Sequence, residues 1–288
     1  MKIGAVMFFT SDSMQPADLG RELESRNFES LWVPEHTHIP STRKTPYPAG
    51  GPLIRPYYDI YDPFIALNTA AAVTTNLKIG TGVCLVPQRD PIVTAKMISS
   101  LDRVSNGRFL FGIGNGWNQD EIENHGTDFK TRHKLGRERI EAMKAIWTQD
   151  EPEYHGELVN IEKMSQWPKP VQRPHPPIIV GGAFPYAARR AVAYGNGWIP
   201  RADRLAKDGI GVLIAKFREM AKEAGRDPAE LPITIFRVPE DLTQLRFCEE
   251  IGIDRIVFSL PADKADAVMP ILDRWSAIKR QLEGQPRP

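Results

Sequence analysis

The chain has 288 residues, 41% of them hydrophobic and 25% charged, which suits one soluble domain with a sizeable core. Its 37 basic and 36 acidic side chains nearly cancel, which argues against a nucleic-acid-binding surface and favours a small-molecule partner. The apolar run over 1–9 is too short to span a membrane and no cleavage site follows it, so we expect a cytoplasmic protein. Cys84 and Cys248 lack metal-ligand spacing and are expected to be reduced thiols.

Short apolar runs alternate with longer amphipathic stretches, the pattern of βα units around a parallel sheet. Strands are predicted at 2–9, 30–34, 77–85, 108–113, 178–180, 197–200, 233–236 and 255–259. Helices are predicted at 16–27, 63–75, 91–104, 130–148, 185–194, 207–225, 240–250 and 263–282, with a frayed tail over 284–288. These units, joined without a linker, predict one (β/α)8 TIM barrel that forms a single domain over residues 1–288.

Two long irregular segments interrupt this pattern and are predicted to be insertions on the barrel. The first, after strand two, spans about 37–62 and is rich in Pro, Gly and Tyr; the second, before strand five, spans about 150–176. Loops of this length inside a compact domain are usually functional. Tyr47, Tyr57 and Tyr58 could line a substrate pocket or simply fix the first loop in place. In this fold the active site lies at the carboxyl ends of the strands, so the residues there are the candidates.

Strand two ends in Pro34-Glu35-His36-Thr37-His38, which puts a carboxylate beside a side chain that titrates near neutral pH. Such a histidine can exchange a proton with a substrate carbonyl or alcohol while a hydride moves. The alternative is a loop histidine that only forms hydrogen bonds. A metal site at Glu35, His36 and His38 is disfavoured because no second cluster with ligand spacing supports it, so we predict no metal.

Strands three and four both end in glycine-rich segments. Gly80 and Gly82 either allow a flat ring to approach the backbone or form a plain β-bulge, and the residues leave both open. The segment 112–118 looks like a dinucleotide fingerprint but lacks the third glycine and the following acidic residue. We therefore interpret it as a strand-to-loop turn against which a ligand can lie.

Strand five ends in Gly181-Gly182-Ala183, immediately before a predicted helix. Free backbone N–H groups at a helix start form an anion site, and Arg189 and Arg190 add positive charge nearby. A cofactor phosphate is the expected guest, although a Gly-Gly pair also serves tight turns.

Several of these segments together resemble a known family. The sequence is similar to luciferase-like oxidoreductases, and within them to the actinobacterial subgroup described as F420-dependent, from Met1 to about residue 260. The segments that carry the resemblance are Val33-Pro34-Glu35-His36-Thr37-His38-Ile39-Pro40, Gly80-Thr81-Gly82-Val83-Cys84-Leu85-Val86-Pro87-Gln88-Arg89-Asp90-Pro91, Gly107-Arg108-Phe109, Gly114-Asn115-Gly116-Trp117-Asn118, Trp167-Pro168-Lys169-Pro170 and Gly181-Gly182.

The resemblance implies roles for particular residues. It implies a non-prolyl cis peptide between Gly82 and Val83, with Gly82, Val83 and Cys84 against the cofactor ring. It puts Glu35 and His36 beside the ring's reactive carbon as the catalytic pair, with His36 handling the proton. Relatives that use F420 often carry Asp-His at this point, whereas this chain has Glu-His. The tail and phosphate of the cofactor are implied to bind at Gly114, Gly116, Asn118, Gly181, Gly182 and Ala183.

The leading functional hypothesis is an F420-dependent oxidoreductase that transfers a hydride between the deazaflavin C5 and a small organic substrate. One alternative is an FMN-dependent luciferase-like monooxygenase on the same scaffold. Another is a barrel that binds flavin or deazaflavin without turnover. The resemblance also implies a homodimer, because relatives are often dimers.

Overall fold

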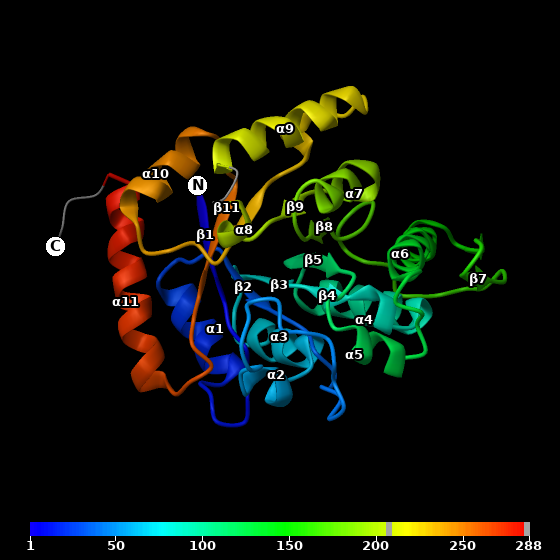
Figure 1. Ribbon diagram of the computed structural model, residues 1–288, viewed down its shortest axis with the longest axis horizontal. Coiled ribbons are helices and arrows are strands. Elements are labelled where there is room, and N and C mark those ends of the chain that lie inside the picture. Colours follow the sequence, from blue (N-terminus) through cyan, green and yellow to red (C-terminus); the bar gives the residue numbers. More distant parts are fainter. Residues whose placement is uncertain (206–208, 285–288) are drawn as a thin grey trace.

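The computed structural model describes residues 1–205 and 209–284, and Figure 1 shows a ring of strands surrounded by helices. Eight parallel strands form the ring in the order β10-β11-β1-β2-β3-β5-β8-β9, and the isolated parallel bridges Trp198–Ile233 and Arg201–Phe236 join its two ends. These strands are β1 (Lys2–Val6), β2 (Ser30–Val33), β3 (Lys78–Thr81), β5 (Phe109–Gly114), β8 (Ile178–Gly181), β9 (Trp198–Ile199), β10 (Thr234–Phe236) and β11 (Arg255–Ser259). The predicted (β/α)8 barrel is confirmed.

The helices that cover the ring follow the strands in chain order (Figure 1). They are α1 (Pro16–Ser25), α3 (Pro63–Ala71), α4 (Pro91–Val104), α6 (Arg132–Thr148), α7 (Tyr186–Tyr194), α8 (Ala202–Leu205), α9 (Ile210–Glu223), α10 (Leu242–Glu250) and α11 (Ala265–Leu282). The predicted helix start at 207 and the frayed tail over 285–288 lie outside the described residues. In residues 1–205 and 209–284, no helix combines the length and apolarity needed to cross a membrane.

Local sequence signals explain where two of these helices begin. Asp62 precedes α3 and its carboxylate accepts hydrogen bonds from the N–H groups of Phe64 and Ile65. Asp90 precedes α4 and accepts from the N–H of Val93. In both cases a proline occupies the first helical position, where its missing N–H costs nothing.

The predicted third strand, 77–85, is wrong as a continuous element. Strand β3 ends at Thr81, and Cys84–Leu85 forms a separate strand, β4, which pairs with β5. The peptide between Gly82 and Val83 is cis, as the family resemblance implied. The predicted helix 16–27 also ends earlier, at Ser25.

The two long irregular segments contain short elements that the sequence did not reveal. Segment 37–62 lies between β2 and α3 and contains α2 (Pro56–Asp59), whereas 150–176 lies between α6 and β8 and contains the hairpin β6 (Tyr154–His155) and β7 (Asn160–Ile161). A further helix, α5 (Gln119–Asn124), follows β5. These elements are too short to produce a periodic pattern.

The inside of the barrel is filled by a compact group of bulky side chains, called the interior plug below. Its members are Val6, Trp32, Leu110, Ile179, Ile199, Phe236 and Val257, all less than 7% exposed. The rings of Trp32 and Phe236 meet edge to face at 5.4 Å. A second, larger apolar layer fills the space between the strands and the helices. The plug makes the barrel a packed core rather than a pore, as this fold requires.

Arg108, at the start of β5, ties together three chain segments. Its guanidinium donates to the carbonyl oxygens of Ala71 (2.9 Å), Thr74 (3.0 Å) and Leu77 (2.7 Å), and its Nε donates to that of Ser105 (2.7 Å). The first of these oxygens ends α3 and the others lie in the turns that lead into β3 and β5. The Gly-Arg-Phe motif at 107–109 therefore has a structural role at the amino ends of the strands.

Replacing Arg108 with Met should lower the free energy of unfolding by about 2–3 kcal/mol, because several half-buried carbonyl groups lose a charged donor. Urea denaturation measures this change. The matched control is Arg137→Met, because Arg137 is exposed and, among the described residues, forms its ion pair with Glu141 one turn along the same helix. A loss below about 0.5 kcal/mol is expected there. Equal losses in the two variants would contradict the assigned role.

Candidate active site

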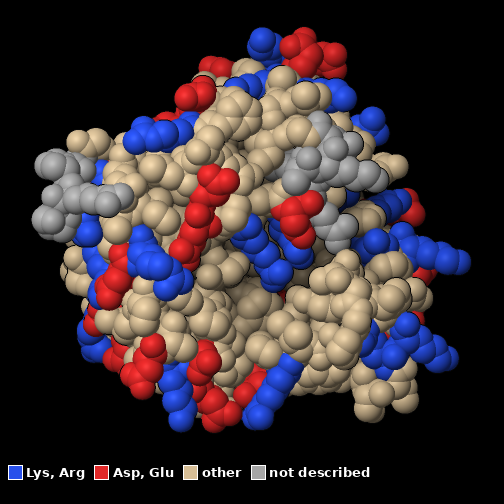
Figure 2. All heavy atoms as spheres, turned by 60° about the vertical axis from the view of Figure 1, so that its left-hand side comes forward, with Lys and Arg blue, Asp and Glu red and all other residues tan. Residues whose placement is uncertain are grey.

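A cavity of about 610 Å³ lies at the carboxyl ends of the barrel strands. Its lining comes from residues that follow β1, β2, β3, β5, β8, β9, β10 and β11, together with the loop at 47–57. The space-filling view shows a hollow in the middle of one face with basic side chains at its edge (Figure 2). The position is the one expected for an active site in a parallel barrel.

Most of the residues predicted from the sequence lie together here. Those in the lining are Glu35, His36, Gly82, Val83, Gly114, Gly116, Gly181, Gly182 and Ala183. Cys84 and Asn118 are not part of the lining. Cys84 is fully buried behind it, and burial raises the pKa of its thiol well above the usual value. Asn118 is 1% exposed. Both cysteines are free thiols, as expected.

His36 is held by a carboxylate that the sequence analysis did not identify. Its Nδ1 lies 2.7 Å from Oε2 of Glu121, whose other oxygen accepts from the N–H of Thr37 at 3.2 Å. A carboxylate can only accept a hydrogen bond, so the pair forms when Nδ1 donates, and in the neutral ring Nε2 is then the acceptor. Both side chains are largely removed from water, with exposed fractions of 7% for His36 and 0% for Glu121. This arrangement fixes the ring orientation and leaves Nε2 available to a bound molecule.

Helix α5, which supplies Glu121, also anchors the loop over the cavity. The carboxylate of Asp120 accepts from the N–H groups of Lys44 and Thr45 and from the Thr45 hydroxyl. The hydroxyl and these N–H groups lower the pKa of Asp120 to about 2. One short helix thus positions both the histidine and the loop 37–62.

Aromatic rings enclose the histidine end of the cavity. The His36 ring lies 4.9 Å from that of Tyr57 and 5.8 Å from that of Trp117, measured between centroids. Tyr47 contacts Tyr57 at 5.4 Å and Trp117 at 6.0 Å. Tyr47 and Tyr57 therefore line the pocket, one of the two roles left open by the sequence, whereas Tyr58 is 57% exposed and does not. The enclosure limits access of water to Nε2.

Glu35 pairs with Arg89, whereas the neighbouring His36 pairs with Glu121. The Glu35 carboxylate accepts from Nε of Arg89 at 2.6 Å and from the N–H of Leu85 at 2.7 Å, and it is 2% exposed. Burial raises the pKa of Glu35, and the Arg89 guanidinium opposes that rise. Arg89 also pairs with Asp62 at 2.7 Å. These bonds tie the end of β2 to β4 and to the start of α3.

Val83 forms the middle of the cavity lining and depends on two glycines. A Cβ atom at Gly114 would lie 2.5 Å from one methyl group of Val83, and a Cβ atom at Gly181 would lie 2.8 Å from the other. Any larger residue at these positions would push Val83 away. Gly82 is tight for a different reason, because a Cβ there would lie 2.7 Å from the Phe236 ring of the interior plug. The glycines at these strand ends thus serve side-chain packing.

Positive charge without an internal partner lies beside the end of β8. Nε of Arg190 is buried and, within the described residues, has no hydrogen-bond partner. His133 lies close by, and burial together with the guanidinium groups of Arg132 and Arg190 lowers its pKa to about 4. The N–H of Gly182 is already bonded to the carbonyl of Ile199, so the predicted free donors do not include it. An anionic group would satisfy Arg190.

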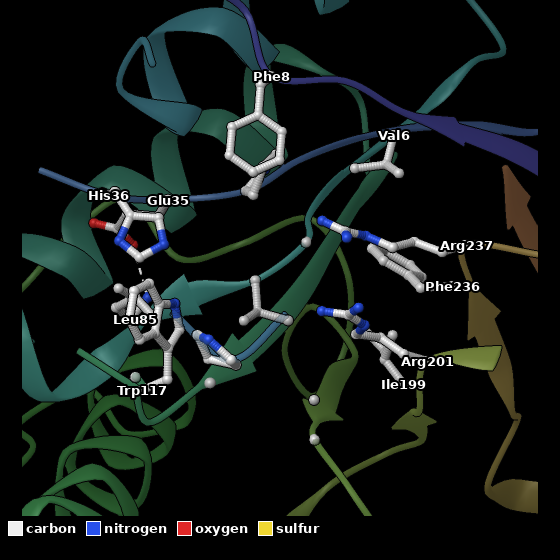
Figure 3. Close-up of a pocket in the computed structure, with 18 of the residues that line it drawn as sticks. Val6, Phe8, Glu35, His36, Leu85, Trp117, Ile199, Arg201, Phe236 and Arg237 are labelled. Atoms are coloured by element: carbon white, nitrogen blue, oxygen red, sulfur yellow. Dashed lines mark hydrogen bonds between the residues drawn. The ribbon is translucent and has the colours of Figure 1, made fainter. Parts of the chain in front are cut away.

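Two further arginines in the lining, Arg201 and Arg237, escaped the sequence analysis. They follow β9 and β10, and Figure 3 shows both guanidinium groups pointing into the open space opposite His36 and Trp117. The position of each just past a predicted strand was the signal that could have identified them.

Comparison with known proteins shows which family the chain belongs to. The family model described as "luciferase-like monooxygenase" matches residues 11–239, most of the chain. The chain belongs to the luciferase-like monooxygenase family. Members of this family are oxidoreductases and monooxygenases, and they include both F420-dependent and FMN-dependent enzymes.

Three curated relatives illustrate the range. An uncharacterized protein of Mycobacterium tuberculosis is 37% identical over 287 residues, covering 96% of this chain and 98% of the relative. The F420-dependent hydroxymycolic acid dehydrogenase of Mycobacterium tuberculosis is 30% identical over 172 residues, which is 59% of this chain and 46% of that protein. The FMNH2-dependent dimethylsulfone monooxygenase of Pseudomonas putida is 32% identical over 130 residues, 44% and 35% of the two chains.

Solved structures agree on the fold. A monooxygenase from Streptomyces bottropensis superposes with a TM-score of 0.76 at 18% identity, covering 96% of this chain and 98% of the other. An F420-dependent secondary alcohol dehydrogenase in complex with an F420-acetone adduct gives a TM-score of 0.73 at 19% identity, with the same coverage. At these identities the likeness concerns the fold alone.

Proposed function

We propose that this chain is an F420-dependent oxidoreductase that transfers a hydride between the deazaflavin C5 and a small organic substrate. The observation that carries the proposal is the His36–Glu121 pair, enclosed by aromatic rings in the cavity at the strand ends. Hydride transfer to or from a carbonyl or alcohol needs a partner that handles one proton, and this pair supplies it.

The residues present fit a phosphate-bearing cofactor of this kind. The buried Nε of Arg190 has no hydrogen-bond partner within the described residues, and a terminal nitrogen of the same guanidinium lies beside Gly182, 3.8 Å from where a Cβ would stand there. Val83, Gly114 and Gly181 would pack against the ring, and Arg190 and His133 would hold the phosphate end. When bound, F420 supplies the hydride chemistry at the C5 of its deazaflavin ring.

The chain itself contributes proton handling, orientation and exclusion of water. Glu121 holds Nδ1 of His36, so the proton is taken up or released at Nε2. Glu121 acts through the histidine and is a positioning residue. Glu35 is also assigned a positioning role here, because its carboxylate is occupied by Arg89 and Leu85.

A fluorescence titration with F420 and, separately, with FMN tests the cofactor. Micromolar F420 binding is expected, with FMN at least about tenfold weaker, a difference of about 1.4 kcal/mol. Arg190→Gln should weaken F420 binding by about tenfold or more, because a charge-assisted contact to phosphate is lost. Arg189→Gln, on the exposed side of the same helix, is the matched control and should bind as the wild type does. Tighter binding of FMN would instead favour a flavin-dependent monooxygenase, and binding of neither would refute the proposal.

The proton-handling pair is tested in the F420-loaded enzyme with an alcohol or carbonyl substrate found by screening, using the change in deazaflavin absorbance. His36→Asn should lower kcat by about 10²–10⁴-fold with little effect on F420 affinity. Glu121→Gln keeps a hydrogen-bonding group but removes the charge that stabilises the imidazolium form. It should therefore reduce kcat and change its pH profile.

The control for this pair is Glu123→Gln, which changes an exposed carboxylate on the same helix and should leave both kcat and the pH profile unchanged. If His36→Asn and Glu121→Gln also leave both unchanged, the catalytic assignment is wrong. Loss of F420 binding in both variants would show that they disturb the fold of the site rather than the chemistry.

A further inference from the structure

The cavity has two further arginines, Arg201 and Arg237, at the ends of β9 and β10, the strands that follow the β8 end beside which Arg190 lies. The two arginines come from consecutive barrel strands, because Arg201 forms a parallel bridge with Phe236, the residue before Arg237. Figure 3 shows both guanidinium groups on the side of the cavity opposite His36. A molecule held between them and His36 would present its reacting group to Nε2.

Arg201 points inward because of strand alternation. Ile199 belongs to the interior plug, and a residue two positions further along an extended strand faces the same side. The guanidinium is held by Asp203, through Nε at 2.9 Å and one terminal nitrogen at 2.6 Å. This pair is partly exposed, with Asp203 at 54%, so water weakens it. Arg201 is thus oriented toward the cavity, and Asp203 neutralises its charge only in part.

Arg237 lines the cavity although the alternation of side chains along a strand would point it outward. Phe236 faces the interior plug, so an extended strand would turn the next side chain outward. Instead Arg237 adopts a φ of 60°, the left-handed region that non-glycine residues rarely occupy. Such a conformation is strained for a non-glycine residue and persists where the surroundings impose it, often at ligand-binding positions. Arg237 thus joins the lining, to which Tyr57 also belongs.

The charges around the cavity do not balance. Among the described residues that line it, the only carboxylate is Glu35, and Arg89 already neutralises that group. Arg190 and Arg237 have no carboxylate partner among the described residues, whereas Arg201 shares its charge with the partly exposed Asp203. The proposed cofactor phosphate is assigned to Arg190. Arg237, together with the water-weakened Arg201–Asp203 pair, can bind a second anion, since planar donors of this kind recognise carboxylate and phosphate groups.

We propose that Arg201 and Arg237 bind an anionic group, a carboxylate or a phosphate, on the substrate of this enzyme. The inference rests on the proposed function, because it takes the β8 end as the cofactor side and His36 as the proton-handling residue. The substrate then combines a small alcohol or carbonyl function near Nε2 with a negative charge at the opposite wall, joined by an apolar part.

Small probes test this directly. The full chain, with and without saturating F420, is titrated with benzoate, phenyl phosphate and benzamide, and binding is followed by calorimetry. Benzoate and benzamide have nearly the same shape, so their difference measures the preference for charge. We expect benzoate or phenyl phosphate to bind at least about tenfold tighter than benzamide in the F420-loaded protein. Arg201→Gln and Arg237→Gln should each remove most of this preference while the affinity for F420 stays as in the wild type.

The controls separate this proposal from the previous one. Arg246→Gln removes an exposed arginine on α10 and should leave the preference intact, which excludes an effect of net charge alone. If benzamide binds as tightly as the anions, or if Arg201→Gln and Arg237→Gln keep the preference, the inference is wrong. If the preference is lost only in Arg190→Gln, the anions bind at the cofactor's phosphate side, and the inference is also wrong. A protein that binds no F420 but keeps the arginine-dependent preference would refute the proposed function and leave the anion site standing.

Discussion

The interior plug is the constraint on which this structure depends. Parallel strands in a closed ring bring all their carboxyl ends to one rim, and the plug, centred on Trp32 and Phe236, fills the barrel below that rim. Buried aromatic pairs of this kind contribute strongly to core packing. The open volume is therefore confined to the rim, where the chain is irregular and polar side chains can face inward. The cavity therefore lies at the rim, above the packed plug, and the candidate residues that line it are at the strand ends and in the loop 37–62.

The two sides of the cavity carry different chemical groups, and the barrel fold alone does not determine this difference. One side carries His36 with its carboxylate partner and a surround of aromatic rings. The β8 end carries Arg190, and the β9 and β10 ends carry Arg201 and Arg237. His36 thus lies across the cavity from Arg201 and Arg237 (Figure 3), and Val83 belongs to the lining. This arrangement suits the proposed cofactor and an anionic substrate.

Much of this architecture could be predicted from the sequence because its signals are local. Alternating apolar runs predict the strands, and the histidine and glycines that follow β2, β3, β5 and β8 mark the rim. Glu121 escaped because α5 has only six residues and no periodic pattern. The position of Arg237 just past a predicted strand made it a candidate, but its inward direction depends on a left-handed φ that no sequence pattern indicates for an arginine.

Two other residues, Cys84 and Glu35, also lie differently from what the sequence predicted, and each has a specific physical cause. Neighbouring residues of a strand face opposite sides, so in β4 Leu85 lines the cavity while Cys84 is buried behind it. Glu35 sits beside His36 in the sequence but turns toward Arg89, because a buried carboxylate without a cationic partner is costly. Adjacency in the sequence therefore suggested a catalytic pair, whereas the histidine's nearest carboxylate comes from a residue 85 positions away.

A crystal structure of the chain with bound F420 would show how the cofactor is oriented in the cavity. The deazaflavin ring is expected to pack on Val83 on the side of His36, with the phosphate on Arg190, leaving Arg201 and Arg237 free for a second molecule. A cofactor bound the other way round, with its phosphate on Arg201 and Arg237, would contradict the assigned polarity of the cavity. A ring remote from His36 would contradict the proposed chemistry as well.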